Sequence, residues 1–204
     1  QAAVRDARAV IAVDLFGQRS HVPEIAARRG WIDTPIIVDA AQSLGALYWN
    51  GWRVGAVGTV CFSFHAVKTI TTAEGGAIAT DDPEVARKCR AMRDHGREDG
   101  LMMMLGFNYR MTELAAALGL SQLRRVDEFI ARRRELSRLY VQALSEVFRT
   151  GALSRPDIDI ERSACHLFPV LFPDDASRDA ARLSLYIAGY GSQIHYQPIV
   201  PLHP

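Results

Sequence analysis

An aspartate and a lysine in this 204-residue chain occupy positions where chemistry is expected. Asp39 follows the apolar run 35–38 and Lys68 follows the apolar run 58–64, and both runs have the length and composition of short buried strands. Open α/β sheets place their ligand sites at the carboxyl ends of the strands. A carboxylate and a lysine at that edge suit pyridoxal phosphate: the lysine forms a Schiff base, and the carboxylate pairs with the protonated pyridine nitrogen.

The neighbours of the lysine agree with this chemistry. Lys68 precedes the run TITTAEGG, whose hydroxyl groups and backbone N–H groups can hold a phosphate. The chain has one other lysine, Lys88, in the segment ARKCRAMR, where a solvated position on a basic helix face is expected. Asp39 alone has a simpler alternative, since an aspartate after a strand often caps a turn or a helix.

The elements that position these residues alternate between β and α. A strand over 9–15, a helix over 22–29 and a strand over 35–38 form a βαβ unit, which predicts a parallel sheet with a right-handed crossover. Two further strands, 58–64 and 76–80, flank the polar turn that contains Lys68.

Helical patterns dominate the middle of the chain. A helix over 82–95 begins with acidic residues and stops at Gly96. The longest apolar periodicity begins at Thr112 and predicts one helix to about residue 148, with Gly119 as a candidate kink. After it, a second and smaller α/β domain is expected to begin with a strand at 166–172, a helix at 176–188 and a strand at 192–196. We therefore predict a large domain over 1–126, and a linking helix with the start of a small domain over 127–204.

Composition excludes several classes of protein. Hydrophobic residues make up 49% of the chain, enough for a packed core, which argues against intrinsic disorder. The 24 basic and 23 acidic residues leave a formal charge of +1, so neither nucleic acid nor an acidic membrane is an expected partner. No apolar run reaches the roughly 20 residues of a membrane span. The three cysteines match no metal-ligand spacing, so no metal site is predicted, and their odd number suggests a reducing, cytoplasmic setting.

Both ends of the sequence have the character of an excised piece. The chain begins at Gln1 without a methionine or a signal-peptide pattern, and it stops after the apolar, proline-rich run IHYQPIVP. We therefore expect a fragment of a longer protein, with both domains incomplete.

Longer motifs around the two residues resemble a known family. The stretch VDAAQSLGALYWNGWRVGAVGTVCFSFHAVKTITTAEGGAIATDD and the later GFNYRMTELAAALGLSQL resemble the DegT/DnrJ/EryC1/StrS nucleotide-sugar aminotransferases, a pyridoxal-phosphate-dependent group. The resemblance extends from VDLFGQ to HYQP. It implies an α/β fold of PLP-dependent transferase type I, with a mixed, mostly parallel sheet in the large domain and a smaller C-terminal α/β domain.

The resemblance also implies roles for particular residues. Lys68 matches the Schiff-base lysine, which also moves a proton during transamination, and Asp39 matches the partner of the pyridine nitrogen. Gln42 matches a side chain that contacts the ring hydroxyl, and Ser63 matches a phosphate ligand. Asn108 matches a residue that reaches the phosphate in the neighbouring subunit, which implies a homodimer with shared active sites. Relatives in which histidine replaces the lysine are dehydratases, so Lys68 favours transamination.

Four other residues are candidate substrate contacts, each with a structural alternative. His65 contacts the substrate or packs against its turn. Arg110 binds a substrate phosphate or anchors the start of the long helix. His195 and Tyr196 lie in IHYQPI, which resembles a segment near the sugar, and a structural role is equally consistent with the pattern.

Within the family, the motifs resemble most the 4-aminotransferases of pseudaminic acid synthesis. The implied reaction moves an amino group from L-glutamate to C4 of a UDP-linked 4-keto-6-deoxy N-acetyl sugar. An aminoarabinose-forming or perosamine-type aminotransferase is the alternative. A non-catalytic regulator with the same fold is the alternative from another class, and the presence of Lys68, Asp39 and Ser63 argues against it.

Overall fold

The computed structural model describes residues 7–21 and 34–196. The chain divides into two compact units, one formed by residues 1–142 and 157–168, the other by residues 143–156 and 169–204. The helix predicted over 22–29 lies outside the described residues. The proposed domain boundary after residue 126 stays a prediction.

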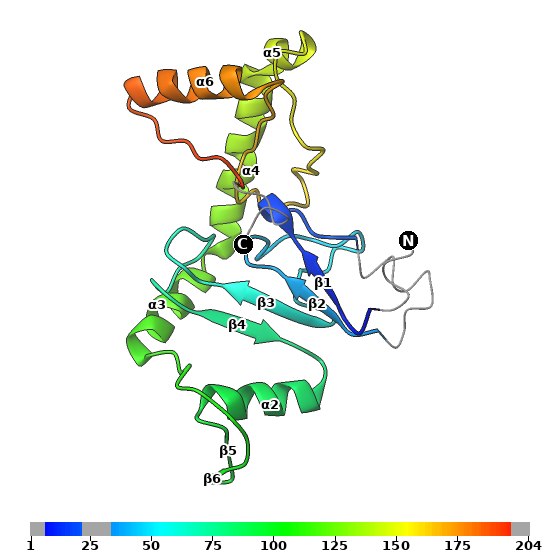
Figure 1. Cartoon of the computed structure of the whole chain (residues 1–204), viewed down its shortest axis with the longest axis vertical. Helices are drawn as coiled ribbons and strands as arrows, with labels where there is room; N and C mark the ends of the chain where they lie inside the picture. The colour runs from blue at the N-terminus through cyan, green and yellow to red at the C-terminus, as the bar shows by residue number, and fades with distance from the viewer. Residues whose placement is uncertain (1–6, 22–33, 197–204) are drawn as a thin grey trace. The chain divides into compact units, whose positions relative to one another are not determined.

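A four-stranded sheet forms the centre of the first unit (Figure 1). Its strands lie in chain order: β1 (Val10–Val13), β2 (Ile36–Asp39), β3 (Thr59–Ser63) and β4 (Gly76–Ala79). The first three strands are parallel, and β4 runs antiparallel to β3. All four predicted strands are therefore confirmed, as is the mixed, mostly parallel character of the sheet.

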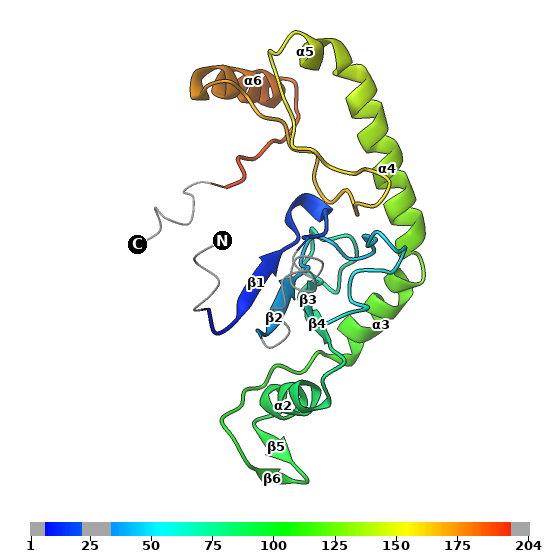
Figure 2. The ribbon, with the colours of Figure 1, turned by 90° about the vertical axis from the view of Figure 1, so that its right-hand side faces the viewer.

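Strand register determines which residues lie together at the carboxyl-end edge of the sheet. Val13 pairs with Asp39, and Asp39 pairs with Cys61, so β1 and β2 end at the same level and β3 continues two residues further, to Ser63. Figure 2 shows these strands side by side, turned by 90° from the first view. Because parallel strands end at one edge, Asp39 and the segment after β3 lie at the same edge of the sheet.

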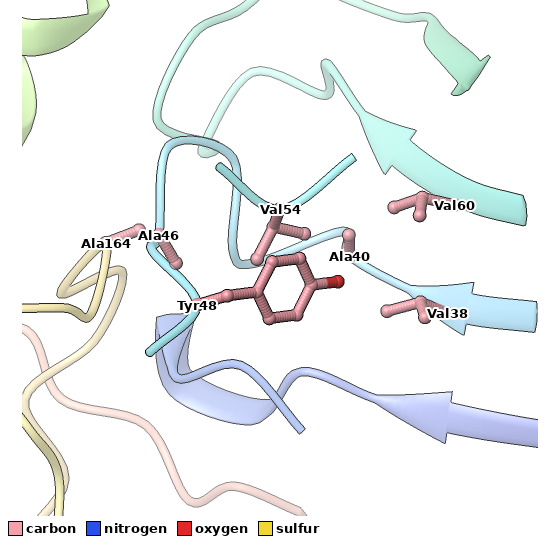
Figure 3. Close-up of a cluster of buried hydrophobic side chains, with 7 residues drawn as sticks. All are labelled: Val38, Ala40, Ala46, Tyr48, Val54, Val60 and Ala164. Carbon is pink, nitrogen blue, oxygen red and sulfur yellow. The ribbon is translucent and has the colours of Figure 1, made fainter. Parts of the chain in front are cut away.

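The core of this unit packs on the two middle strands (Figure 3). Val38 and Val60 point to the same face, and both are at most 3% exposed. The loop after β2 and a single residue of the segment 157–168 cover them, through Ala40, Ala46, Tyr48, Val54 and Ala164. The small side chains let this loop lie close to the sheet, which fixes the backbone just beyond Asp39.

Helices and short elements complete the described chain. Side-chain caps begin three of the helices: Asp82 for α2, Thr112 for α3 and Asp174 for α6. None of the described helices is both long and apolar enough to cross a membrane. The remaining elements are the 3-10 turn η2 (Leu15–Gly17), the hairpin of β5 (Arg97–Glu98) and β6 (Leu101–Met102), and the helices α2 (Pro83–Arg93), α3 (Glu113–Leu123), α4 (Val126–Ala143), α5 (Ser145–Arg149) and α6 (Asp175–Ile187).

The single long helix predicted from residue 112 to 148 is wrong. The structure divides it into α3, α4 and α5, and the first break falls after Leu123 rather than at Gly119. Gly119 continues α3 and serves close packing instead, because a Cβ there would lie 2.8 Å from Cγ2 of Thr72. The glycine therefore lets α3 approach the loop that carries Lys68.

Two strands predicted near the C-terminal end are also wrong. The run 166–172 forms only an isolated bridge between Leu171 and Ser154, and the run 192–196 has no strand pairing. An apolar run forms a strand only where a neighbouring strand edge supplies hydrogen bonds to it. Among the described residues these two runs find a single bridge, between Leu171 and Ser154. The predicted helix over 176–188 is confirmed as α6.

The segment 163–167 closes against the turn after β1. Ala164 donates its N–H to the carbonyl of Gly17 (2.9 Å), and His166 donates to that of Phe16 (3.1 Å). Gly17 has φ +96°, and a Cβ there would lie 2.7 Å from the backbone nitrogen of His166. Two distant parts of the chain therefore meet where only glycine fits.

Replacing Gly17 with alanine is expected to lower the free energy of unfolding by about 3 kcal/mol, because the added Cβ is strained and meets backbone atoms. Chemical denaturation measures this loss. Gly191→Ala is the matched control, because nothing lies within 4 Å of its Cβ position. Equal stability of the two variants would show that the close approach at Gly17 is not required.

Candidate active site

Asp39 is the last residue of β2 and is half-buried. Its Oδ1 accepts a hydrogen bond from the N–H of Ala41 (3.0 Å). Its second oxygen accepts no hydrogen bond from any residue that the structure describes. The turn thus fixes the orientation of the carboxylate and leaves one oxygen available to a ligand.

Lys68 lies in a loop that closes on a single residue, Phe64. The Phe64 N–H donates to the carbonyl of Gly75 (2.8 Å), and its carbonyl accepts the N–H of Thr72 (2.9 Å). Inside the loop, the Lys68 N–H donates to the carbonyl of His65 (3.0 Å). The loop is therefore a closed turn between β3 and β4, and Lys68 sits within it.

The side chain of Lys68 has no polar partner among the residues that the structure describes. It is half-buried, and within residues 7–21 and 34–196 its ammonium group makes neither a hydrogen bond nor an ion pair. Lys88 differs, because its Nζ lies 3.3 Å from Glu84 Oε1 on the exposed side of α2. The amine of Lys68 is thus available for chemistry, and the predicted surface position of Lys88 is confirmed.

The Lys68 loop packs against one helix and is hydrogen-bonded to another. Ile70 is 2% exposed and packs with Val126 and Ile130 of α4. The N–H of Thr71 donates to Oε1 of Gln122 in α3 (3.0 Å). These contacts fix the backbone on the C-terminal side of Lys68.

Ile70→Ala is expected to reduce the free energy of unfolding by about 2–4 kcal/mol, since it opens a cavity beneath the loop. Thermal or urea unfolding measures the change. Ile70→Val is the graded control, with an expected loss of about 1 kcal/mol. A loss as small for alanine as for valine would mean that Ile70 does not anchor the loop.

The hydroxyl groups after Lys68 serve the loop itself. Thr71 Oγ1 donates to the carbonyl of Phe64 (3.2 Å), and Thr72 Oγ1 donates to that of Glu74 (2.7 Å). Both side chains therefore help to close the turn, a use that the sequence pattern did not reveal.

Ser63 and His65 lie on either side of Phe64. Ser63 ends β3, and its Oγ accepts the N–H of His65 (3.3 Å), which leaves the hydroxyl proton free to donate. The exposed His65 ring has its Nε2 3.6 Å from Glu74 Oε1. This contact supports a position on the turn, while a substrate role for His65 stays a prediction.

The side-chain oxygen of Gln42 accepts a hydrogen bond from the backbone. Its Oε1 accepts the N–H of Phe16 (2.7 Å), a residue with φ +60°. The oxygen thus supports an unfavourable backbone conformation next to the site. Contact of Gln42 with a cofactor stays a prediction.

Sequence reasoning missed Asp14, the residue that follows β1. It is 1% exposed, and both of its carboxylate oxygens accept hydrogen bonds, from Ser20 N–H (2.7 Å) and Ser43 Oγ (2.6 Å). Burial raises the pKa of Asp14 above its usual value, and the hydrogen bonds from these serines oppose that shift. An acidic residue directly after an apolar strand was the signal that could have revealed it.

Asn108 and Arg110 belong to an exposed segment before α3. Asn108 forms an isolated bridge with Asp94, whose carboxylate pairs with the Arg110 guanidinium. The ion pair lines an open cavity of about 690 Å³. Arg110 thus anchors this segment and also faces a space that a ligand could enter, and its substrate role stays a prediction.

His195 and Tyr196 belong to the second unit. Both are exposed, and their rings meet edge to face with centroids 4.6 Å apart. Their predicted contact with a sugar stays a prediction.

The polar groups at the sheet edge fit pyridoxal phosphate. Asp39 offers a half-buried oxygen for a protonated ring nitrogen, Lys68 offers an amine without a partner, and Ser63 offers a hydroxyl for a phosphate. These are the three kinds of group that a cofactor with a pyridine ring, an aldehyde and a phosphate requires.

Comparison with known proteins agrees with this chemistry. The sequence profile of the DegT/DnrJ/EryC1/StrS aminotransferase family matches residues 1–204. The chain belongs to this family. A curated member from Campylobacter jejuni, UDP-4-amino-4,6-dideoxy-N-acetyl-beta-L-altrosamine transaminase, is 36% identical over 200 residues. That alignment covers 93% of this chain and 52% of the relative, so this chain spans about half the length of the relatives it matches.

Solved structures of this aminotransferase family have the same fold. Helicobacter pylori PseC, an aminotransferase of pseudoaminic acid biosynthesis, is 31% identical with a TM-score of 0.80, covering 95% of this chain and 53% of that one. DesV from S. venezuelae is 32% identical with a TM-score of 0.83, covering 98% and 53%. The predicted family and the predicted PLP-dependent transferase fold are therefore both confirmed.

Proposed function

We propose that the protein is a pyridoxal-phosphate-dependent aminotransferase that moves an amino group from L-glutamate to C4 of a UDP-linked 4-keto-6-deoxy N-acetyl sugar. The observation that carries the proposal is the placement of Lys68 and Asp39 at one edge of the sheet, each with a reactive atom free of partners among the described residues. The C. jejuni relative, named as a transaminase of a UDP-linked amino sugar, supports the choice of acceptor.

Asp39 holds the ring end of the cofactor. When bound, pyridoxal phosphate supplies an aldehyde carbon that accepts an amino group and a ring that withdraws electrons from it. The second oxygen of Asp39 would accept a hydrogen bond from a protonated ring nitrogen, and its negative charge would favour that protonation. The N–H of Ala41 keeps the carboxylate oriented while it does so.

Lys68 has two tasks. Its Nζ would hold the cofactor covalently between turnovers, and after an incoming amine has displaced it the same atom would move a proton to and from the substrate carbon. The closed loop around Phe64 keeps the amine in place through both steps.

The phosphate is held by Ser63 and by Asn108 of a second copy of the chain. The Asn108 side chain is exposed and makes no hydrogen bond within the described part of the chain, which leaves it available to another subunit. The proposal therefore includes a homodimer with shared sites. We assign Gln42, on the turn beside Asp39, as a contact of the cofactor ring, and its Oε1 also accepts the N–H of Phe16 (2.7 Å).

The reaction proceeds in two halves. With the cofactor bound, L-glutamate would be the amino donor and would leave as 2-oxoglutarate, and the ketosugar would be the acceptor at C4, with Lys68 moving the proton in both halves. We assign His65, Arg110, His195 and Tyr196 as substrate contacts. The reaction is placed in the cytoplasm, in agreement with three free cysteines, Cys61, Cys89 and Cys165.

The test is the visible absorption spectrum of the intact protein with pyridoxal phosphate, recorded before and after L-glutamate is added. We expect a band for the lysine-bound cofactor and its conversion by glutamate to the amine form, with one equivalent of 2-oxoglutarate released. Addition of a UDP-linked 4-keto-6-deoxy N-acetyl sugar is then expected to restore the first band.

Each outcome discriminates among functions. Conversion by glutamate with no response to this sugar would overturn the acceptor and favour an aminoarabinose-type or perosamine-type substrate. Binding without conversion would overturn glutamate as the donor. Absence of the lysine-bound band would overturn the enzyme assignment and favour a regulator with the same fold.

A further inference from the structure

Asp14 is a buried carboxylate in contact with the turn that follows Asp39. It follows β1, and its backbone N–H donates to the carbonyl of Asp39 (2.9 Å), which continues the strand pairing by one residue. Its side chain is among the least exposed of the polar groups in the described chain, at 1%. A carboxylate at this depth is costly unless its hydrogen bonds are complete.

The two oxygens of Asp14 bind two different turns, one near in sequence and one distant. One oxygen accepts the N–H of Ser20 (2.7 Å), and the other accepts the hydroxyl of Ser43 (2.6 Å), which is fully buried. The carboxylate therefore ties the turn after β1 to the turn after β2. Hydrogen bonds to a buried carboxylate are stronger than those between neutral groups, so the tie is rigid.

The tethered turn 40–43 is the one that orients Asp39. Its Ala41 N–H fixes one oxygen of Asp39, and its Ser43 N–H donates to the carbonyl of Ala40 (3.1 Å). Gln42, between them, binds Phe16 on the opposite segment. A shift of Ser43 would therefore displace the N–H that sets the direction of the Asp39 carboxylate.

We propose that Asp14 is a positioning residue, which acts through Ser43 to hold the turn 40–43 so that Asp39 presents its free oxygen to the ring nitrogen of pyridoxal phosphate. This inference rests on the proposed function. Asp14 itself does not touch the cofactor in this arrangement, because both of its oxygens are already bonded to serines.

Ser43→Ala removes the tether and leaves the carboxylate in place. In the intact protein we expect the affinity for pyridoxal phosphate to fall about 10- to 100-fold, the loss expected when a binding group is slightly displaced. With cofactor labelled with ¹⁵N in the ring, we expect the nitrogen resonance to move toward that of the unprotonated ring. Asp14→Asn, which preserves the shape of the side chain, is the second variant and is expected to act in the same direction.

Two comparisons separate positioning from general stability. Ser137→Ala removes another buried serine hydroxyl, in α4, and is expected to leave both the affinity and the nitrogen resonance unchanged. In an Asp39→Asn background, Ser43→Ala is expected to have no further effect on the resonance, because the two residues act in one path.

Loss of thermal stability in Ser43→Ala and Asp14→Asn, with wild-type affinity and nitrogen resonance, would overturn the inference and leave Asp14 a structural residue. An additive effect of Ser43→Ala on Asp39→Asn would overturn it as well. If the wild-type protein itself binds no pyridoxal phosphate, the proposed function fails, and this inference fails with it. If the wild-type protein binds the cofactor and the two variants bind it equally well, only this inference fails.

Discussion

Replacing Lys68 with alanine is expected to reduce amino transfer at least about 1,000-fold in the intact protein, while the protein remains folded. Activity is lost because the amine both binds the cofactor and moves the proton, and no other residue can supply that group. Folding is retained because the Lys68 side chain makes no hydrogen bond or ion pair with the described residues. Release of 2-oxoglutarate from L-glutamate measures activity, and circular dichroism with thermal unfolding measures the fold.

Lys88→Ala is the matched control, because Lys88 is the only other lysine in the chain. Its loss breaks one exposed contact with Glu84, and solvent screening leaves such exposed ion pairs with little effect on stability. Activity is therefore expected to stay at the wild-type level. Substantial turnover by Lys68→Ala, or equal losses in the two variants, would contradict the assignment of Lys68.

Asp39→Asn is expected to lower turnover about 100- to 1,000-fold, the range seen when a charge-stabilising group is removed from an active site. Asparagine retains an oxygen for the Ala41 N–H, so the turn after β2 remains formed. It carries no negative charge, however, so the ring nitrogen is no longer held in its protonated form. Single-turnover kinetics with L-glutamate measure the loss separately from cofactor binding.

Asp81→Asn provides the comparison, since Asp81 is exposed in the turn after β4 and makes no side-chain hydrogen bond in the described structure. We expect no change in its turnover. A rate for Asp39→Asn within a few-fold of the wild-type rate, at saturating cofactor, would contradict the role given to the Asp39 charge.

Local sequence patterns were sufficient for the sheet and for its functional edge. Short apolar runs bounded by glycine, proline and aspartate predicted all four strands, because such runs are typical of strands. Asp39 and Lys68 stood out for the same reason: each polar residue follows a run that is otherwise apolar. Helix caps such as Asp82 and Asp174 also act within a few residues, and α2 and α6 formed where expected.

Predictions failed where the answer depended on a distant neighbour. Gly119 suggested a kink when viewed within its helix, yet it packs against Thr72, 47 positions earlier in the chain. The run 166–172 has strand composition, but its N-terminal part binds the turn at Phe16 instead of a sheet edge. The composition of a segment shows which secondary structure it can form. Whether that structure forms depends on the segments that pack against it.

The sequence by itself therefore determined the four strands of the sheet, the family and the two residues on which the proposed chemistry depends, because these are encoded in short patterns and in a contiguous motif. Only the tertiary structure decided how Asp39 is held. It brought Asp14, Ser43 and Phe16 together from two segments more than twenty residues apart, through hydrogen bonds that no local pattern encodes. The physical reason is burial: a buried carboxylate requires partners, and which residues supply them is fixed by packing rather than by proximity in the chain.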